Sequence, residues 1–207
     1  FHIYSGGKGA NQAVAAQRSG AAVAMVGAVG DDSFGCDRRD ELGRDGIDLD
    51  GVRQIDGMAS GVALITVEQE GENRIAYVPG PTLMIDAEQV RATVFRIRPA
   101  VYLQPNEVPV EVAKAGLRAA RDVGAVTILN AAPDPEKVHE LLADVDHLIV
   151  NEGEAAALLG RVGSFAEMAQ RLAQESGVSV VLTAGAEGAY GVHGVEAVHV
   201  PAPPVTV

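Results

Sequence analysis

The sequence predicts an α/β protein with a mainly parallel central sheet and a small β-rich appendage. Short apolar runs alternate with helix-like stretches along most of the 207 residues, and strands joined by helices imply a parallel sheet. Residues 52–80 differ, because two β-rich runs flank the turn-like segment "EQEGEN". We therefore expect residues 1–51 and 81–207 to form the α/β core, and residues 52–80 to form the appendage, a candidate lid.

Glycine and polar residues mark the ends of the expected elements in the first half of the chain. The helix of residues 10–20 ends at Gly20, which suits a C-terminal cap. The run "AAVAMVGAVG" (21–30) is apolar throughout, which is typical of a buried parallel strand. A helix is expected at 33–46 with Ser33 as its N-cap, and the hairpin of the appendage follows.

The second half of the chain continues the alternation of strands and helices. Strands are expected at 100–105, 125–133, 146–151 and 178–185, helices at 108–124, 134–145, 152–160 and 164–177, and a closing hairpin at 188–201. Ligands of such sheets bind beyond the carboxyl ends of the strands. That rule selects four polar or glycine-rich segments: 104–107, 130–133, 151–154 and 183–188.

Composition excludes several classes of partner. The net charge of −12 argues against a nucleic acid held through its phosphates. No apolar run approaches the roughly 20 residues that span a bilayer, and no signal peptide is visible. The single cysteine, Cys36, cannot form an internal disulfide, which favours a reducing compartment, by default the cytoplasm; we interpret it as a small buried hydrophobic residue. Both chain ends fall inside strand-like segments, so we expect a piece of a longer protein.

The opening segment "SGGKGANQAVAA" (5–16) has two interpretations. It is a tight turn that carries a lysine, or it is a loop that closes around a ligand. Gly7 admits close backbone approach, Lys8 offers three donors on one charge, and Asn11 offers both a donor and an acceptor. Gly9 follows the lysine where a P-loop needs Ser or Thr, so the segment is not a P-loop.

The segment "NEGE" (151–154) also has two interpretations. Asn151 and Glu154 have the spacing of a capping box. The same amide and carboxylate suit a hydrated Mg²⁺ near a phosphate, because magnesium keeps most of its waters and needs few protein ligands.

Two further loops carry candidate residues. "TAGAEGAY" (183–190) is either a strand-to-hairpin turn or a loop against a nucleotide, with Thr183, Gly185 and Gly188 available to it. Glu107 follows a strand between two prolines, which fix the backbone around it; the alternative is a solvated surface glutamate. The five histidines show no metal-binding spacing.

Taken together and in this order, the motifs resemble the ribokinase family of phosphofructokinase-B-type sugar kinases. The matching stretches are "GGKGANQAVAAQRSGA", "GAVGDDSFG", "LGRDGID", "SGVALITVEQEGEN", "NAAP", "NEGEAAALLG" and "VVLTAGAEGAY". The resemblance implies a three-layer sandwich with a small β-sheet lid, which closes over the sugar and often forms the contact of a homodimer.

The resemblance also implies an activity and a set of roles. The activity is transfer of the ATP γ-phosphoryl group to the primary hydroxyl of ribose, which depends on positioning and charge neutralisation. The sugar would contact Gly7, Lys8, Asn11 and Glu107; the nucleotide would contact Asn151, Thr183, Gly185 and Gly188; Glu154 would organise Mg²⁺. A monovalent cation such as K⁺ activates members of the family.

The chain departs from the family pattern at its end. The family's Gly-Ala-Gly-Asp element, with the aspartate base, would lie beyond Val207, so no catalytic residue is assigned within the chain and we expect no ribose phosphorylation from it alone. Two rival functions stay open: a kinase for another sugar or a nucleoside, and a non-catalytic sugar-binding protein on the same scaffold. A dinucleotide-dependent oxidoreductase is disfavoured, because no G-x-G-x-x-G follows an early strand.

Overall fold

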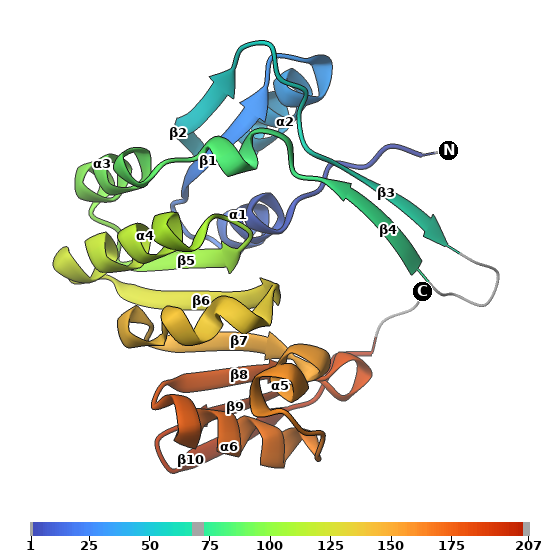
Figure 1. The fold of residues 1–207 in the computed structure, drawn as a ribbon, viewed down its shortest axis with the longest axis vertical. Helices are drawn as coiled ribbons and strands as arrows, with labels where there is room; N and C mark the ends of the chain where they lie inside the picture. Colours follow the sequence, from blue (N-terminus) through green and yellow to red (C-terminus); the bar gives the residue numbers. More distant parts are fainter. Residues whose placement is uncertain (1, 68–72, 205–207) are drawn as a thin grey trace. The chain divides into compact units, whose positions relative to one another are not determined.

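A computed structural model describes residues 2–67 and 73–204 (Figure 1). The chain forms two compact units, Phe1–Thr93 and Val94–Val207, and each is described by itself. The α/β class, with a mostly parallel sheet and a small antiparallel sheet, is confirmed.

The second unit is built on a six-stranded sheet in the order β10-β9-β8-β7-β6-β5. The strands are β5 (Val101–Asn106), β6 (Val126–Pro133), β7 (His147–Asn151), β8 (Ser179–Thr183), β9 (Ala189–His193) and β10 (Glu196–Val200). Strands β5 to β8 are mutually parallel, and β9 and β10 are antiparallel. The expected strands and the closing hairpin are therefore present, and four carboxyl ends meet at one edge of the sheet.

Helices α4 (Val110–Asp122), α5 (Glu152–Leu159) and α6 (Phe165–Ser176) lie on one face of this sheet (Figure 1). Their small and aliphatic residues pack against alternate residues of the strands, and Leu117, Leu129, Leu148 and Leu182 are fully buried there. This contiguous apolar cluster is the core that fixes where the strands end.

The prediction of an α-helix at 134–145 is wrong. The segment forms two 3₁₀ helices, η2 (Pro135–Glu140) and η3 (Leu142–Asp144). Val138 and Leu141 are both fully buried, and their spacing of three matches the three residues per turn of a 3₁₀ helix.

The first unit contains α1 (Lys8–Arg18), β1 (Ala24–Gly30), α2 (Ser33–Arg44), β2 (Asp48–Ile55), and the 3₁₀ helix η1 (Gly80–Met84). Strands β1 and β2 pair in parallel, and Ala10, Ala13, Leu42 and Ile47 form a small core between the helices and these strands. Residues 52–55, which the sequence places in the appendage, lie in β2 and pair with β1. Sequence reasoning missed β2 and also α3 (Ala87–Ile97).

Two local expectations in this unit are wrong. Asp32, not Ser33, caps α2, because its side chain accepts a hydrogen bond from the Gly35 N–H at 2.9 Å. Cys36 is exposed rather than buried.

The expected hairpin of the appendage is present. Strands β3 (Val62–Val67) and β4 (Asn73–Val78) pair antiparallel, with Ile65 opposite Ile75. The expected turn at 68–72 lies outside the described residues. Large apolar side chains of the hairpin are exposed, among them Leu64 (58%), Ile65 (60%), Ile75 (61%) and Tyr77 (52%).

Candidate functional site

The glycine-lysine loop of the first unit leads directly into α1. Gly7 is the residue that precedes the helix and has φ 96°, and Lys8 is the first helical residue. The Asn11 N–H donates to the Gly7 carbonyl at 2.8 Å, which places Asn11 on the first turn. Gly7 and Asn11 are exposed and Lys8 is half-buried. The three predicted sugar-binding residues of this unit therefore lie together at an accessible helix N-terminus.

A side chain of α2 holds the loop. The Ser5 hydroxyl donates to the Glu41 carboxylate, which also pairs with Arg38 at 3.2 Å. The Ser5 hydroxyl, followed by Arg38, holds the pKa of Glu41 below its usual value. Glu41 is thus an ionised anchor for the segment that precedes Gly7.

The second unit lines up the remaining predicted residues along one edge of its sheet. Asn151 is the last residue of β7 and pairs in register with Thr183, the last residue of β8. Asn106, the last residue of β5, pairs with Pro133 at the end of β6, and Glu107 follows it. Because neighbouring strands lie about 4.8 Å apart, the edge from β5 to β8 measures about 14 Å.

The capping-box interpretation of Asn151 and Glu154 is confirmed. The Asn151 side-chain oxygen accepts from the Glu154 N–H at 2.8 Å, and Glu154 Oε2 accepts from the Asn151 N–H at 2.9 Å. Glu154 Oε1 accepts from Asn151 Nδ2 at 3.0 Å. The carboxylate, in a residue only 9% exposed, is therefore oriented by two bonds to a single partner residue.

The same carboxylate retains capacity for a hydrated metal ion. Each carboxylate oxygen has about two acceptor sites, and the capping box uses part of them. Magnesium binds proteins through one or two carboxylates plus waters, so one oriented carboxylate in the first turn of α5 fits Mg²⁺. Within the described residues, no group of three or more His, Cys, Asp or Glu side chains is placed to hold a metal directly.

The loop after β8 contains two glycines, one with open space around it and one that is tightly packed. Gly185 (φ 55°) begins the short 3₁₀ helix η4 (Gly185–Glu187), and a Cβ there would meet nothing within 4 Å. Gly188 (φ 95°) is in close contact, since a Cβ there would lie 2.0 Å from the Val200 carbonyl oxygen. The Thr183 hydroxyl donates to the Val150 carbonyl at 3.3 Å. Gly185 is thus open to a ligand, whereas Gly188 has a structural reason to be glycine.

Sequence reasoning did not single out Asn106 as a residue that positions Glu107. Asn106 is 7% exposed, and its side-chain amide donates to the Asp134 carbonyl. Gln104, on the same face of β5, accepts from the Tyr102 hydroxyl at 2.6 Å. Burial raises the pKa of Tyr102, so this hydroxyl stays protonated and donates. These buried contacts fix the strand end from which Glu107 extends.

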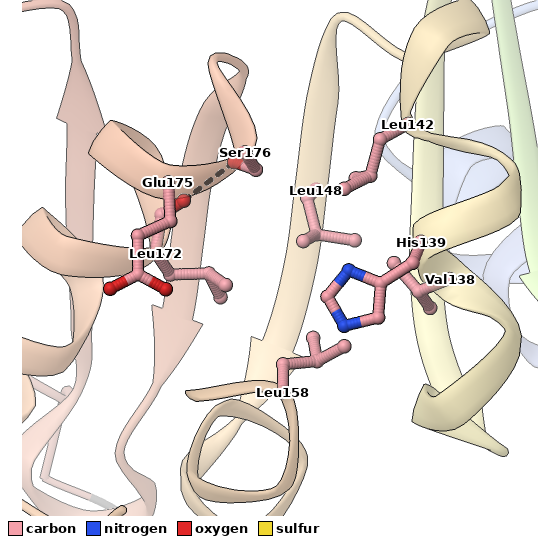
Figure 2. A pocket seen from close by; sticks show the side chains of 8 residues that line it. All are labelled: Val138, His139, Leu142, Leu148, Leu158, Leu172, Glu175 and Ser176. Carbon is pink, nitrogen blue, oxygen red and sulfur yellow. Dashed lines mark hydrogen bonds between the residues drawn. The ribbon is translucent and has the colours of Figure 1, made fainter. Parts of the chain in front are cut away.

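A small pocket on the helical face of the second unit is a different feature. Figure 2 shows Leu148, Leu158 and Leu172 around it, with His139 and Glu175 contributed by separate segments. Its volume of about 40 Å³ is far below the roughly 300 Å³ of the smallest ordinary ligand pockets. We interpret it as incomplete packing of the core.

Comparison with known families gives a match along the whole chain. The sequence model described as pfkB family carbohydrate kinase matches residues 1–207. Ribokinase of Schizosaccharomyces pombe is 37% identical over 202 residues, and ribokinase of Haemophilus influenzae is 32% identical over 195 residues. Each alignment covers 92% of this chain and 64% of the relative. The chain thus spans less than two thirds of these relatives.

A solved structure shares the fold. Arabidopsis thaliana ribokinase, described as complexed with ribose and ATP, superposes with a TM-score of 0.83 at 28% identity, over 98% of this chain and 68% of that one. This similarity confirms the fold expected from the sequence. In the described part of the chain, no helix has the length and apolarity required to cross a bilayer.

Proposed function

The chain belongs to the pfkB family of carbohydrate kinases, and from that premise we propose that the protein transfers the ATP γ-phosphoryl group to ribose, giving ribose 5-phosphate. The observation that carries this proposal is the row of Glu107, Asn151 and Thr183 along the carboxyl edge of one sheet. Two findings from the comparisons support the proposal. The two similar relatives are ribokinases, and a structurally similar protein is described as complexed with ribose and ATP.

On this proposal the sugar hydroxyls are held by Gly7, Lys8, Asn11 and Glu107. The ammonium of Lys8 and the amide of Asn11 supply donors, and the carboxylate of Glu107 supplies acceptors. Such groups recognise hydroxyls and hold the reacting oxygen in position, which is the main requirement of phosphoryl transfer. The accessible loop before α1 and the fixed end of β5 support these roles.

The nucleotide contacts are proposed for Asn151, Thr183, Gly185 and Gly188. Asn151 and Thr183 are neighbours at the ends of β7 and β8, and the open Gly185 admits close backbone approach. Glu154 is proposed to orient the waters of a Mg²⁺ ion, which when bound neutralises phosphate charge. The protein's contribution there is the fixed direction of the Glu154 carboxylate.

We further propose a homodimer formed through the β3–β4 hairpin, in the cytoplasm. Alternate residues of a strand point to opposite faces, and both faces of this hairpin are apolar and exposed, with Leu64 on one and Ile65 on the other. One face is then available to cover the sugar and the other to meet a second copy. The exposed Cys36 thiol suits a reducing compartment.

The test is an ATP-dependent phosphorylation assay of the protein expressed from its complete reading frame. Ribose, 2-deoxyribose, fructose and adenosine are compared at equal concentration, with product identified by mass. Ribose is expected to give the highest kcat/KM. A preference for another acceptor would reassign the substrate, and ribose-dependent thermal stabilisation without turnover would support a sugar-binding protein instead.

A further inference from the structure

The carboxylate of Asp32 joins two segments that are far apart in sequence. Its Oδ1 accepts from the Gly35 N–H at 2.9 Å and from the Ser60 hydroxyl at 2.6 Å, and its Oδ2 accepts from the Ser60 N–H at 2.9 Å. The Ser60 hydroxyl in turn accepts from the Gly30 N–H at 3.0 Å. One carboxylate therefore connects the end of β1, the start of α2 and the residue two positions before β3.

The packing around this connection leaves no space for a side chain at either of two glycines. A Cβ at Gly30 would lie 2.3 Å from the Met58 carbonyl oxygen, and a Cβ at Gly35 would lie 2.2 Å from the Gly30 carbonyl oxygen and 2.9 Å from the Ser60 hydroxyl. Ser60 itself is 9% exposed. The backbone at Gly30 and Gly35 thus runs so close to Met58, Gly30 and Ser60 that only glycine fits at these two positions, and Ser60 packs directly beside the end of β1 and the start of α2.

The constraint on Ser60 extends to both strands of the hairpin. A Cβ at Gly61 would lie 2.8 Å from the Pro79 carbonyl oxygen, and a Cβ at Gly80 would lie 2.4 Å from the Gly61 nitrogen. The chain entering β3 and the chain leaving β4 are therefore in contact where the hairpin begins. Farther along, Leu64, Ile65, Ile75 and Tyr77 are more than half exposed, so their packing does little to set the direction of the hairpin.

We propose that Asp32, acting through Ser60, is a positioning residue that fixes the direction in which the β3–β4 hairpin leaves the first unit, and thereby sets the affinity for the sugar. The effect on sugar affinity rests on the proposed function, whereas the direction of the hairpin concerns the first unit alone. Asp32 touches neither substrate in this scheme. Hydrogen bonds to a charged group are stronger than neutral ones, so a single carboxylate suffices to hold the hairpin while the rest of it remains exposed.

The test measures hydrogen exchange in the protein without ligand. Asp32→Asn, which places an amide donor among N–H donors, and Ser60→Ala, which leaves the Gly30 N–H without its partner, are compared with wild type. Backbone exchange in Val62–Val67 and Asn73–Val78 is expected to become about tenfold faster in both variants. Exchange in α1 is the internal reference, and Asp37→Asn and Ser33→Ala, both exposed on α2, are the matched controls.

Three results would overturn the proposal. The first is hairpin exchange equal to wild type in both variants. The second is faster exchange that is equal in α1 and in the hairpin, because that is general destabilisation; this comparison within one molecule stays valid in a weakened variant. The third is faster hairpin exchange with an unchanged KM for ribose, which would leave Asp32 a structural anchor only.

The kinetic result separates the two proposals. We expect the KM for ribose to rise about tenfold in Asp32→Asn with kcat changed by less than about threefold. If the wild-type protein neither binds nor phosphorylates ribose, the proposed function fails, and the exchange comparison still decides whether Asp32 directs the hairpin.

Discussion

Glu154 is a residue whose structural and proposed functional roles can be separated by substitution. Its capping bonds to Asn151 need an acceptor, whereas the proposed role near Mg²⁺ needs a negative charge. Glutamine keeps one acceptor oxygen for the Asn151 N–H, as in other capping boxes, but it loses the bond to Asn151 Nδ2 and carries no charge.

We therefore predict that Glu154→Gln lowers the free energy of unfolding by about 0.5 kcal/mol, for the lost bond to Asn151 Nδ2, while Glu154→Ala costs about 1 kcal/mol or more. Both are expected to raise the KM for MgATP about tenfold or more. Urea unfolding and steady-state kinetics measure the two effects. The second capping box, Ser164 and Glu167 at the start of α6, supplies the control: Glu167→Gln should leave the KM unchanged. Wild-type kinetics in Glu154→Gln would restrict Glu154 to capping.

Asp146 makes stability depend on pH. Its Oδ2 accepts from the Thr127 N–H at 2.8 Å and from the Thr127 hydroxyl at 2.9 Å. The Thr127 N–H is the largest cause that lowers the pKa of Asp146, and the hydroxyl and the charge of Arg121 add to it. A folded-state pKa below the unfolded value gives stability that is present above the unfolded pKa and lost as pH falls through the folded one.

We predict that Asp146→Asn lowers the urea midpoint at pH 7 and has a smaller effect as the pH falls through the lowered folded-state pKa of Asp146, where the wild-type carboxyl also becomes neutral. Urea titrations at several pH values measure it. Exposed Asp122 on α4 gives the control Asp122→Asn, for which no such pH-dependent difference is expected. An equal loss at both pH values would assign the effect to shape rather than charge.

At the scale of elements, the loop after β8 is held by the backbone contact at Gly188. We predict that Gly188→Ala destabilises the protein by at least about 2 kcal/mol, because a Cβ there meets the Val200 carbonyl oxygen at 2.0 Å in a residue with φ 95°. Gly185→Ala, with φ 55° and open space, should cost about 1 kcal/mol. Thermal unfolding checks both, and equal costs would contradict this account of the loop.

The sequence predicts correctly those elements whose apolar residues form a clear pattern because they are buried. Strands β5 to β8 were recognisable from apolar runs, and the strand-end rule then located Asn151 and Thr183. The sequence pattern does not reveal β2, because "DLDGVRQI" interleaves charges with Gly51. It predicts an α-helix at 134–145, because the spacing of three between the buried Val138 and Leu141 also fits an α-helix. The partners of Asn106 and Ser5 lie 28 and 36 positions away, and no local pattern shows such pairs. The roles of the site residues stay predictions.

Ion pairs join α4 to the segment that follows β6. Lys114 contacts Glu140 at 2.9 Å, and Arg118 contacts Asp144 at 3.1 Å. Residues three and four apart on a helix share a face, so these cations lie along one side of α4. Because these pairs are partly exposed they contribute little, and the burial of Val138 and Leu141 is what holds the two short 3₁₀ helices against the core.

At the scale of the whole molecule, the proposed dimer depends on the hairpin. Ile65 and Ile75 pair on one face and Leu64 and Ala76 on the other. We predict that Ile65→Lys converts a dimer to a monomer, while Leu64→Lys leaves the dimer intact, as measured by light scattering after size-exclusion chromatography. The face with Ile65, Ile75 and Tyr77 carries the larger apolar side chains and is the expected contact. A monomeric wild type, or a dimer that survives Ile65→Lys, would contradict the proposed contact.

The same hairpin has a consequence for how the protein behaves at low concentration. Residues Val62–Val67, "VALITV", carry no charge and no proline, which is the composition of segments that stack into amyloid. In the proposed dimer, a second copy covers the face of this strand that carries Ile65. If this dimer forms, its dissociation on dilution exposes a strand able to pair with other copies, so tight association of the subunits protects the protein from forming fibrils.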